Sequence, residues 1–528
     1  MHIQEIVKLL VEQHLLVSAP DNLPVIKINA ISTDSRQVQP GNIFVAIPGT
    51  QHDGHTFIQE ALNKGAQAVI SEYTLELPVP LLQVVNSRQA VALLSAHWWG
   101  YPSQKLLCSG ITGTNGKTTT AFILNAILEK AGYRTGLMGS ILTKIQDHVY
   151  PSTMTTPDAP TLQHLLHHMV EEEVEAVTLE VSSHGILQDR CFGISFAAGI
   201  LTNISPDHHD LHPTLDHYIQ TKLAFFQLVA PTGLRAVNGD DPLIQKAITS
   251  VNLPNLVYFG LTKSCHLQAV GLQVQPSKSI FTLAWNSLPQ IDGAICPPGQ
   301  VPVTLNIPGK HNVYNALGAA TAALFLGIPP EIIVEALATF TGVARRLQLV
   351  HEGNIRIIDD FAHNPASIRT AIEACLLLDS QHIIIVNAIR GNRGLTINRE
   401  NAATLASYYR LRPQNISLII TSSQEIVGEH DLVSPAEAEA FLTTLEDTQT
   451  PFTYYPQLNT ALKSSLSKVK KGDLILLLGA QGMEQGAEQV QKLLLDTPEI
   501  VTFDPYDELS VEPTIINLPT YLNQRHTD

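Results

Sequence analysis

A glycine-rich segment constrains the fold of this 528-residue chain more than any other feature. It reads Gly110-Ile111-Thr112-Gly113-Thr114-Asn115-Gly116-Lys117-Thr118-Thr119-Thr120. A β-like apolar run over 106–112 leads into it, and a helical pattern over about 117–130 follows it. A turn of this kind between a strand and a helix presents backbone N–H groups and the helix N-terminus to phosphate. The segment therefore predicts a phosphate-binding loop in an α/β domain.

The residues of this loop have distinct expected roles. Those expected to contact a nucleotide are Gly113, Thr114, Asn115, Gly116, Lys117, Thr118 and Thr119. Lys117 supplies a mobile cation, and the Thr118 hydroxyl is a candidate Mg²⁺ ligand. Ile111 stands where the strict G-x-x-x-x-G-K-[ST] pattern has its first glycine. The alternative interpretation is a tight glycine turn that binds nothing.

Short β-like runs alternate with helical stretches along the chain, and new series of strands begin near 105 and near 343. Such alternation predicts βαβ units with largely parallel sheets covered on both faces. We expect an α/β fold with three domains. They are a small N-terminal α/β domain (1–104), a central P-loop parallel-sheet ATPase domain (105–342) and a Rossmann-like C-terminal domain (343–528) with an irregular tail after 496.

Composition excludes several classes of protein. The net charge of −16 disfavours non-specific binding to nucleic acid or to an anionic membrane. The five cysteines are scattered and form no C-x-x-C pair, which is typical of a reducing compartment. Because there is also no signal-peptide pattern and no apolar run long enough to cross a bilayer, we expect a cytoplasmic protein. Of the oligomeric states, a monomer is the expectation.

Further short motifs follow the loop at regular positions. They are Glu180-Val181-Ser182-Ser183-His184, Gln188-Asp189-Arg190, the segments 202–208 and 218–222, and, in the first domain, Asp34-Ser35-Arg36, 40–46 and Asp53-Gly54-His55. Together with 112–119 they resemble the Mur ligase superfamily, which includes folylpolyglutamate and cyanophycin synthetases, over about 30–485. The resemblance is greatest to the UDP-N-acetylmuramoyl-tripeptide synthetase (MurE-type) branch, which adds the third residue to UDP-N-acetylmuramoyl-dipeptide.

The resemblance implies an ATP-dependent ligase that activates a carboxylate as an acyl phosphate, which an amine then displaces. The charge that gathers in such a reaction calls for Mg²⁺ and cationic side chains. Implied metal ligands are Thr118, Glu180, His208 and Lys222, the last as a carbamate formed with CO₂. Taken singly, Glu180 would be an ordinary strand end, His208 a capping residue and Lys222 a surface lysine. A zinc hydrolase site is rejected despite the neighbouring histidines.

Other expected contacts also come from the resemblance. For the carboxylate substrate they are Thr155, Thr156, Ser182, Gln188 and Arg190, and for the uridine diphosphate portion Ser35 with the loop at 52–55. For ATP they are Asn312, Arg346, Asp360 and His363, of which the last two help to close the third domain over the nucleotide. Each serine or threonine could instead form a turn or cap, and Asn315 could be a helix cap.

The third domain departs from the family pattern at three places. Where diaminopimelate-adding members carry Asp-Asn-Pro-Arg, this chain has Thr421-Ser422-Ser423-Gln424. Where the family has Ala-Gly-Lys-Gly-His-Glu, the chain has Gly479-Ala480-Gln481-Gly482-Met483-Glu484, which leaves Glu484 to hold an acceptor ammonium group. Arg390 and Arg393 replace a Gly-Asp-Arg-Asp segment. They are candidates for binding phosphate or an acceptor carboxylate, or else exposed loop arginines.

These observations predict an ADP-forming amide ligase with small-molecule substrates, ATP and Mg²⁺. The expected carboxylate belongs to a UDP-N-acetylmuramoyl-peptide, and the expected acceptor is an amino acid or amine other than diaminopimelate. One alternative is a relative from specialised metabolism or polyamino-acid synthesis that acts on another carboxylate. A second is a regulatory protein that binds ATP without ligating, and a third is a simple phosphotransferase.

Overall fold

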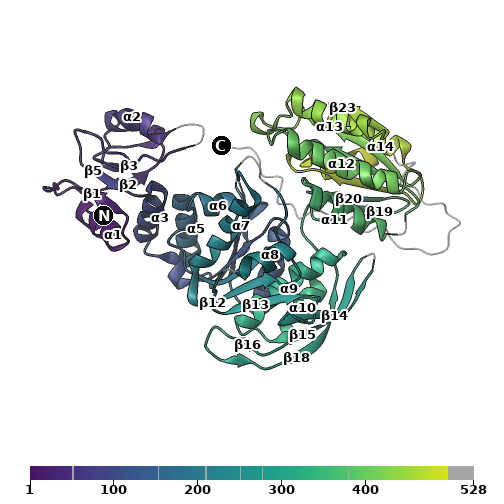
Figure 1. Ribbon diagram of the computed structural model, residues 1–528, viewed down its shortest axis with the longest axis horizontal. Coiled ribbons are helices and arrows are strands. Elements are labelled where there is room, and N and C mark those ends of the chain that lie inside the picture. Colours follow the sequence, from purple (N-terminus) through teal and green to yellow (C-terminus); the bar gives the residue numbers. More distant parts are fainter. Residues whose placement is uncertain are drawn as a thin grey trace.

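The computed structural model describes residues 1–49, 53–152, 154–207, 211–249, 251–275, 277–378 and 380–496. Three large sheets follow one another along the chain, each with helices on its faces (Figure 1). A small antiparallel sheet of two strands, β16 (Leu288–Pro289) and β17 (Ile295–Cys296), lies within the part of the chain that forms the second large sheet. The expected tail after 496 and His208 lie outside the described residues. In the described part of the chain, no helix is both long and apolar enough to span a membrane.

The first sheet has five strands in the order β1-β5-β4-β3-β2. β1 is antiparallel to β5, and the other neighbours are parallel. The strands are β1 (Leu16–Ser18), β2 (Ala30–Ser32), β3 (Asn42–Val45), β4 (Ala68–Ser71) and β5 (Leu81–Val84). The helices are α1 (Ile3–Glu12), α2 (Ile58–Asn63) and α3 (Ser87–Trp98).

The central sheet has eleven strands in the order β18-β15-β14-β13-β12-β11-β6-β10-β7-β8-β9. Its middle, from β14 to β7, is parallel, and antiparallel strands extend both edges. The parallel strands are β6 (Leu107–Thr112), β7 (Thr135–Met138), β10 (Ala176–Glu180), β11 (Phe196–Leu201), β12 (Val229–Asn238), β13 (Leu256–Gly260) and β14 (Leu267–Val274). The edge strands are β8 (Leu142–Ile145), β9 (His148–Pro151), β15 (Ser279–Trp285) and β18 (Gly299–Leu305).

The third sheet has six strands in the order β19-β20-β24-β21-β22-β23, parallel except for β19. Its strands are β19 (Gln348–Glu352), β20 (Arg356–Asp360), β21 (Ile383–Ala388), β22 (Ile416–Thr421), β23 (Phe452–Tyr455) and β24 (Leu474–Leu478). Its helices are α11 (Pro365–Leu376), α12 (Leu395–Leu411), α13 (Pro435–Asp447), α14 (Leu458–Lys468) and α15 (Gly486–Asp496). This confirms the α/β class and the parallel sheets expected from the sequence.

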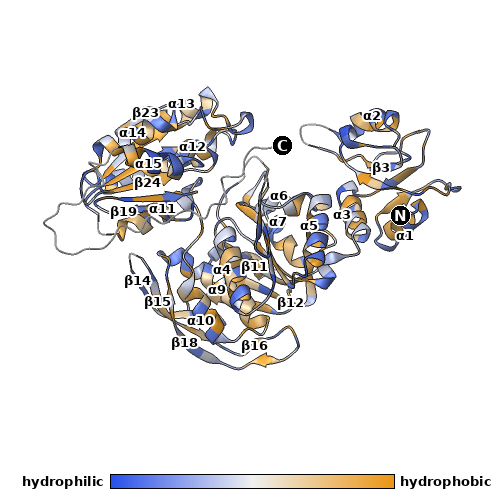
Figure 2. Cartoon of the chain, turned by 180° about the vertical axis from the view of Figure 1, so that it is seen from behind, coloured by the Kyte–Doolittle hydropathy of each residue, from blue (hydrophilic) through white to orange (hydrophobic). Residues whose placement is uncertain are grey.

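Each sheet carries an apolar core on both faces, which Figure 2 shows as apolar strands between amphipathic helices. In the central sheet, one core packs under α4 (Lys117–Lys130), α9 (Lys310–Phe325) and α10 (Pro330–Thr339). The other packs under α5 (Ala159–Glu171), α7 (Leu215–Ala224) and α8 (Pro242–Ile248). Ligands of such sheets bind beyond the carboxyl ends of the parallel strands.

Local sequence explains why these helices begin where they do. The first turn of α5 follows Asp158, whose side chain accepts a hydrogen bond from the Thr161 N–H, and a proline stands at its start. α11 begins after Asn364, which forms a reciprocal capping box with Ser367. α4 instead follows Gly116, which has φ +86° and provides no side-chain cap, so that the first N–H groups of the helix are left available.

Candidate functional site

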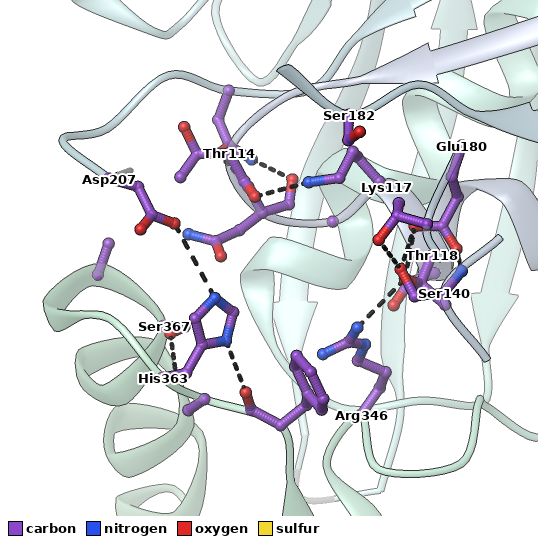
Figure 3. Close-up of a pocket in the computed structure, with 18 of the residues that line it drawn as sticks. Thr114, Lys117, Thr118, Ser140, Glu180, Ser182, Asp207, Arg346, His363 and Ser367 are labelled. Carbon is purple, nitrogen blue, oxygen red and sulfur yellow. Dashed lines mark hydrogen bonds and ion pairs between the residues drawn. The ribbon is translucent and has the colours of Figure 1, made fainter. Parts of the chain in front are cut away.

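A pocket of about 850 Å³ lies between the central and third sheets. On the central side it is lined by the phosphate-loop segment 114–119 and by residues at the ends of β10 and β11 and at the start of α9. On the third-domain side, residues that follow β20, β21 and β24 line it. The carboxyl ends of parallel strands from two sheets therefore face one cavity (Figure 3).

The phosphate loop is held closely against its surroundings. Lys117 Nζ donates to the Gly113 and Thr114 carbonyl oxygens at 2.9 and 3.0 Å. A Cβ at Gly113 would collide with Thr202 Oγ1, and one at Gly116 with Asn315 Oδ1, so only glycine fits there. Burial lowers the pKa of Lys117, against the opposing charges of Glu180 and Asp207.

Oxygen atoms gather beside the start of α4. Thr118 Oγ1 donates to Glu180 Oε2 at 2.9 Å, and Glu180 is completely buried at the end of β10. The Ser140 N–H donates to Glu180 Oε1 at 2.8 Å, and Ser140 Oγ lies 3.0 Å from Thr155 Oγ1. A buried carboxylate and a hydroxyl are hard ligands of the type that Mg²⁺ prefers, so these residues fit the expected ion. No group of three or more His, Cys, Asp or Glu side chains placed to hold a metal occurs among the described residues, which do not include His208.

Lys222 lies under the loop, on α7, and not among the residues that line the pocket. Its Nζ donates to the Gly113 carbonyl at 2.8 Å and lies 4.5 Å from the centre of the Tyr218 ring. Burial, followed by the charge of Lys117, lowers its pKa well below the ordinary value, while Asp207 opposes the shift. Lys222 is therefore biased towards its neutral, nucleophilic form.

The residues expected to bind the carboxylate substrate form one hydrogen-bonded group. The Ser182 N–H donates to Thr156 Oγ1 at 2.9 Å, and the Thr156 hydroxyl donates to the Glu180 carbonyl at the same distance. Arg190 Nη1 donates to the Thr156 carbonyl at 2.6 Å, and Gln188 Oε1 accepts from Arg190 at 2.7 and 3.1 Å. Gln188 thus orients Arg190 and does not itself line the pocket.

Polar side chains near the start of α9 line another part of the pocket. Asn312 Nδ2 donates to the Pro308 carbonyl at 2.7 Å and its Oδ1 accepts from Asn315 at 3.1 Å. Tyr314, whose hydroxyl donates to Asp240 Oδ2 at 3.0 Å, and His311 also line it. Sequence reasoning identified Asn312 here but missed these two aromatic side chains, which can stack on a flat base.

The linker between the second and third sheets also reaches the phosphate loop. Arg346 Nη2 donates to Thr118 Oγ1 at 3.2 Å, and the guanidinium lies 4.6 Å from the centre of the Phe361 ring (Figure 3). Asp360 fixes this linker, because its carboxylate accepts from the Leu347 and Ala362 N–H groups at 2.7 and 2.9 Å. Arg346 thus places a positive charge beside the candidate Mg²⁺ ligands.

One buried carboxylate joins the central and third domains. Asp207 Oδ2 accepts from Asn364 Nδ2 at 3.0 Å, and its Oδ1 lies 3.5 Å from Arg390 Nη1. His363 Nε2 lies 3.9 Å from the same carboxylate (Figure 3). Asp207 lies in the segment 202–208 noted in the sequence, but no role was expected for Asp207 or for Asn364.

Positions 421–423, at the end of β22, carry hydroxyl side chains and no charged side chain. Thr421, Ser422 and Ser423 are buried there, and their hydroxyls bond to one another or to neighbours such as the Tyr454 hydroxyl at 2.9 Å. The charged side chains that do line this side are Arg390, Arg393 and Glu484. Arg393 is partly exposed and lies 3.3 Å from Asp431.

Most of the expected site residues meet in the pocket. Those that line it are Thr114, Asn115, Gly116, Lys117, Thr118, Thr119, Thr155, Thr156, Glu180, Ser182, Arg190, Asn312, Arg346, Asp360, His363, Arg393 and Glu484. Gly113, Gln188, Lys222 and Ser35 do not. Ser35, in the first domain, donates to Glu60 Oε2 at 2.7 Å. Ser140 was missed, although it follows the end of β7 and contacts Glu180.

A phosphate loop, adjacent hard oxygen ligands and cationic residues of a second α/β domain across a pocket define a nucleotide-dependent transfer enzyme. Family comparisons agree. The chain matches the Mur ligase family catalytic domain over 27–99, the Mur ligase middle domain over 111–323 and the Mur ligase glutamate ligase domain over 345–481. The chain belongs to the Mur ligase family, and it is an enzyme of the ATP-dependent class that forms C–N bonds.

Named relatives are consistent with this assignment. A UDP-N-acetylmuramoyl-L-alanyl-D-glutamate–2,6-diaminopimelate ligase of Geobacillus thermodenitrificans is 32% identical over 459 residues, covering 86% of this chain and 89% of the relative. A solved structure of a ligase with that name has a TM-score of 0.63 at 21% identity, covering 93% of this chain and 99% of the other. MurF ligase of Thermotoga maritima in complex with ADP has a TM-score of 0.59 at 20% identity, covering 89% and 98%. These structures show the shared three-domain fold.

Proposed function

We propose that this enzyme uses ATP and Mg²⁺ to join an amino acid or amine to the carboxylate of a UDP-N-acetylmuramoyl-peptide. The observation that carries the proposal is the meeting of Lys117, Thr118, Glu180 and Arg190 in one pocket. They supply a phosphate-binding cation, hard metal ligands and a guanidinium for a carboxylate. The curated relative named for a UDP-N-acetylmuramoyl substrate supports the choice of substrate.

The proposed chemistry has two steps. An oxygen of the substrate carboxylate attacks the γ-phosphorus of ATP, and ADP leaves. The amine then attacks the acyl carbon of the resulting acyl phosphate, loses a proton and expels inorganic phosphate, which forms the amide. Thr118 and Glu180, with His208 as an expected third ligand, would hold Mg²⁺, which when bound would supply positive charge to the phosphate oxygens.

The chain's own residues bind and orient the reactants. Lys117 and the N-terminus of α4 hold phosphate, and Arg346 adds positive charge beside Thr118. Arg190, oriented by Gln188, binds the substrate carboxylate near Thr156 and Ser182. Asn312 binds the base of the nucleotide. Asp360 and His363 place the third domain over the pocket, where it excludes water from the acyl phosphate.

Lys222 is proposed to carry a carbamate formed from its neutral amine and CO₂, with loss of a proton. Support comes from its burial beneath the loop and its lowered pKa. The carbamate would convert a buried amine into an anionic oxygen ligand for the metal site.

The acceptor is proposed to lack a distal carboxylate of the diaminopimelate type. Positions 421–423, at the end of β22, carry hydroxyl groups. Those of Thr421 and Ser423 bond to each other, and that of Ser422 bonds to the Tyr454 hydroxyl and the Pro456 carbonyl. Arg393 would bind the acceptor carboxylate and Glu484 its ammonium group. The same rebuilt region favours one second candidate, a ligase with this chemistry that acts on a different carboxylate.

The first domain is proposed to bind the nucleotide part of the carboxylate substrate. Ser35 and the first domain would bind the uridine diphosphate portion, and the domain limits are proposed to be 1–104, 105–342 and 343–528. The substrates are proposed to be small molecules of the cytoplasm, and the protein to act there as a monomer.

The test is ADP release with Mg-ATP and UDP-N-acetylmuramoyl-L-Ala-D-Glu across a panel of amino acids and amines, with mass spectrometry of the products. We expect one acceptor to give ADP and a product whose mass is the sum of both substrates less water. Absence of turnover with every acceptor, in protein that binds ATP, would refute this carboxylate and favour the second candidate.

A further inference from the structure

The segment from Arg390 to Gly394, which we call the arginine loop, follows β21 in the third domain, and its Arg390 and Arg393 line the pocket. The guanidinium of Arg390 is 11% exposed and faces Asp207, which is 2% exposed, with 3.5 Å between Nη1 and Oδ1. Asp207 belongs to the central domain, a few residues beyond β11. This ion pair therefore connects two domains at the edge of the pocket and is shielded from water.

Hydrogen bonds to two side chains fix the backbone of the arginine loop within the third domain. The Glu437 carboxylate, at the start of α13, accepts from the N–H groups of Asn392, Arg393 and Gly394 at 2.9 to 3.1 Å. Asn398 accepts from the Arg390 N–H at 3.3 Å and donates to the Arg390 carbonyl at 2.8 Å. Arg390 is thus held by both its backbone and its guanidinium, so that a shift of the loop would move the ion pair.

The Asp207 carboxylate is also linked, through Asn364, to the phosphate loop. Asn364, which is completely buried, donates from Nδ2 to Asp207 at 3.0 Å and to Asn115 Oδ1 of the phosphate loop at 3.4 Å. Arg390 and Asn364 come from the ends of different strands of the third sheet, β21 and β20. Two points of attachment to one buried carboxylate fix the orientation of the third domain as well as its distance.

We propose that Arg390 is a positioning residue for the ligation: through Asp207 it fixes the arginine loop, and with it the acceptor side of the pocket, against the phosphate loop. This inference rests on the proposed function in one respect, which is that the phosphate-loop side of the pocket holds the activated carboxylate and the arginine-loop side holds the amine. Misplacement of reacting groups by about 1 Å can cost about 100-fold in rate. Arg390 acts on this geometry and does not touch the reacting atoms.

The first experiment measures domain geometry without turnover. Spin labels are attached to cysteines introduced as Lys246→Cys on α8 and Arg410→Cys on α12, both at exposed positions. The five native cysteines are buried and so are shielded from the label. Double electron–electron resonance on the full chain should give a narrow distance distribution in the otherwise unmodified protein. Arg390→Met should broaden or shift it, Arg390→Lys should largely preserve it, and Arg399→Met, at an exposed arginine of α12, should leave it unchanged.

The second experiment measures kinetics for the same variants. We expect Arg390→Met to lower kcat about 10- to 100-fold, with the KM for ATP within about threefold, and Arg390→Lys to recover most of the rate. An unchanged distance distribution in Arg390→Met overturns the proposal, as does a loss of kcat that Arg399→Met shares. If the protein without any of these substitutions releases no ADP, the proposed function fails, and the distance measurement alone decides whether Arg390 fixes the domains.

Discussion

At the scale of single residues, Lys117 shows how the phosphate loop is prepared for an anion. Its ammonium group bonds to two carbonyl oxygens of its own loop, and it is partly shielded from water. If a phosphate entered the pocket, Lys117 could exchange its hydrogen bonds to two neutral carbonyl groups for a stronger, charge-assisted hydrogen bond to the phosphate. The lysine is therefore held close to its proposed ligand.

We predict that Lys117→Ala lowers ADP formation at least about 100-fold, because it removes the cation that stabilises charge on the transferred phosphoryl group. A coupled assay of ADP release measures this. Lys130→Ala is the matched control, since it lies at the opposite end of α4 and forms an exposed ion pair with Glu335 at 2.5 Å. Retention of activity within about threefold in Lys117→Ala would contradict the assigned phosphate site.

Lys222 gives a second prediction at this scale. Lys222→Ala should lose activity, because the anionic ligand formed by the carbamate is absent, and added formate or acetate should restore part of it. The rate is measured against the concentration of added carboxylate in Lys222→Ala and in the protein with Lys222 intact. The rate of the protein with Lys222 intact should not change with the added carboxylate. Full activity of Lys222→Ala without an added carboxylate would disprove the carbamate.

At the scale of elements, α13 fixes the arginine loop through the carboxylate of Glu437. Burial would raise the pKa of this carboxyl, but N–H donors from Ser434, Gly394 and Arg393 outweigh burial and lower the pKa from its ordinary value of 4.5. A carboxyl with a lowered pKa contributes stability above its unfolded pKa, and this contribution is lost as the pH falls through the folded value.

We therefore predict that Glu437→Gln lowers the free energy of unfolding at pH 7 by about 1–3 kcal/mol, because hydrogen bonds to a charged carboxylate become hydrogen bonds to a neutral amide. The difference should begin to shrink as the pH falls below about 4.5, where the carboxyl of the unfolded chain becomes protonated, and should be lost as the pH falls through the lower pKa of the native carboxyl. Urea unfolding at pH 7 and pH 4 measures this. Glu439→Gln, at a neighbouring position of the same helix, is the control. A difference that does not depend on pH would disprove the role of the charge.

Elements whose signal is contiguous could be predicted from the sequence. The helix expected over 117–130 has those bounds, because a glycine turn starts it and an apolar pattern continues through it. The antiparallel hairpins β8–β9 and β14–β15 could not be predicted, because edge strands are set by pairing with distant strands and not by local propensity. Ser140 was missed for a related reason, since its role depends on Glu180 in another strand.

At the scale of the whole molecule, the site exists only where two domains meet. Lys117 and Arg190 were predictable because each lies in a recognisable motif of the central domain. The contacts that Asp207 makes with Asn364 and Arg390 were not, because they join residues about 160 to 180 positions apart and depend on how the third domain sits. No local pattern in a single sequence encodes such a docking arrangement.

Domain closure leads to a prediction for ligand binding. A ligand that binds only the folded pocket stabilises it, by about 2.7 kcal/mol at 100 times its Kd. Mg-ATP should therefore raise the Tm of the unmodified protein, and Lys117→Ala should show a much smaller rise at the same concentration. Differential scanning fluorimetry measures both. Equal shifts in the two proteins would place the nucleotide elsewhere.

The central claim is that a carboxylate is activated by phosphoryl transfer and then joined to an amine. The direct test uses a carboxylate substrate labelled with ¹⁸O, Mg-ATP and the acceptor identified in the panel, followed by mass spectrometry of the inorganic phosphate. Because the attacking carboxylate oxygen stays with phosphorus when the acyl phosphate is displaced, we predict one ¹⁸O atom in each phosphate released. Unlabelled phosphate accompanying amide formation would contradict the proposed mechanism.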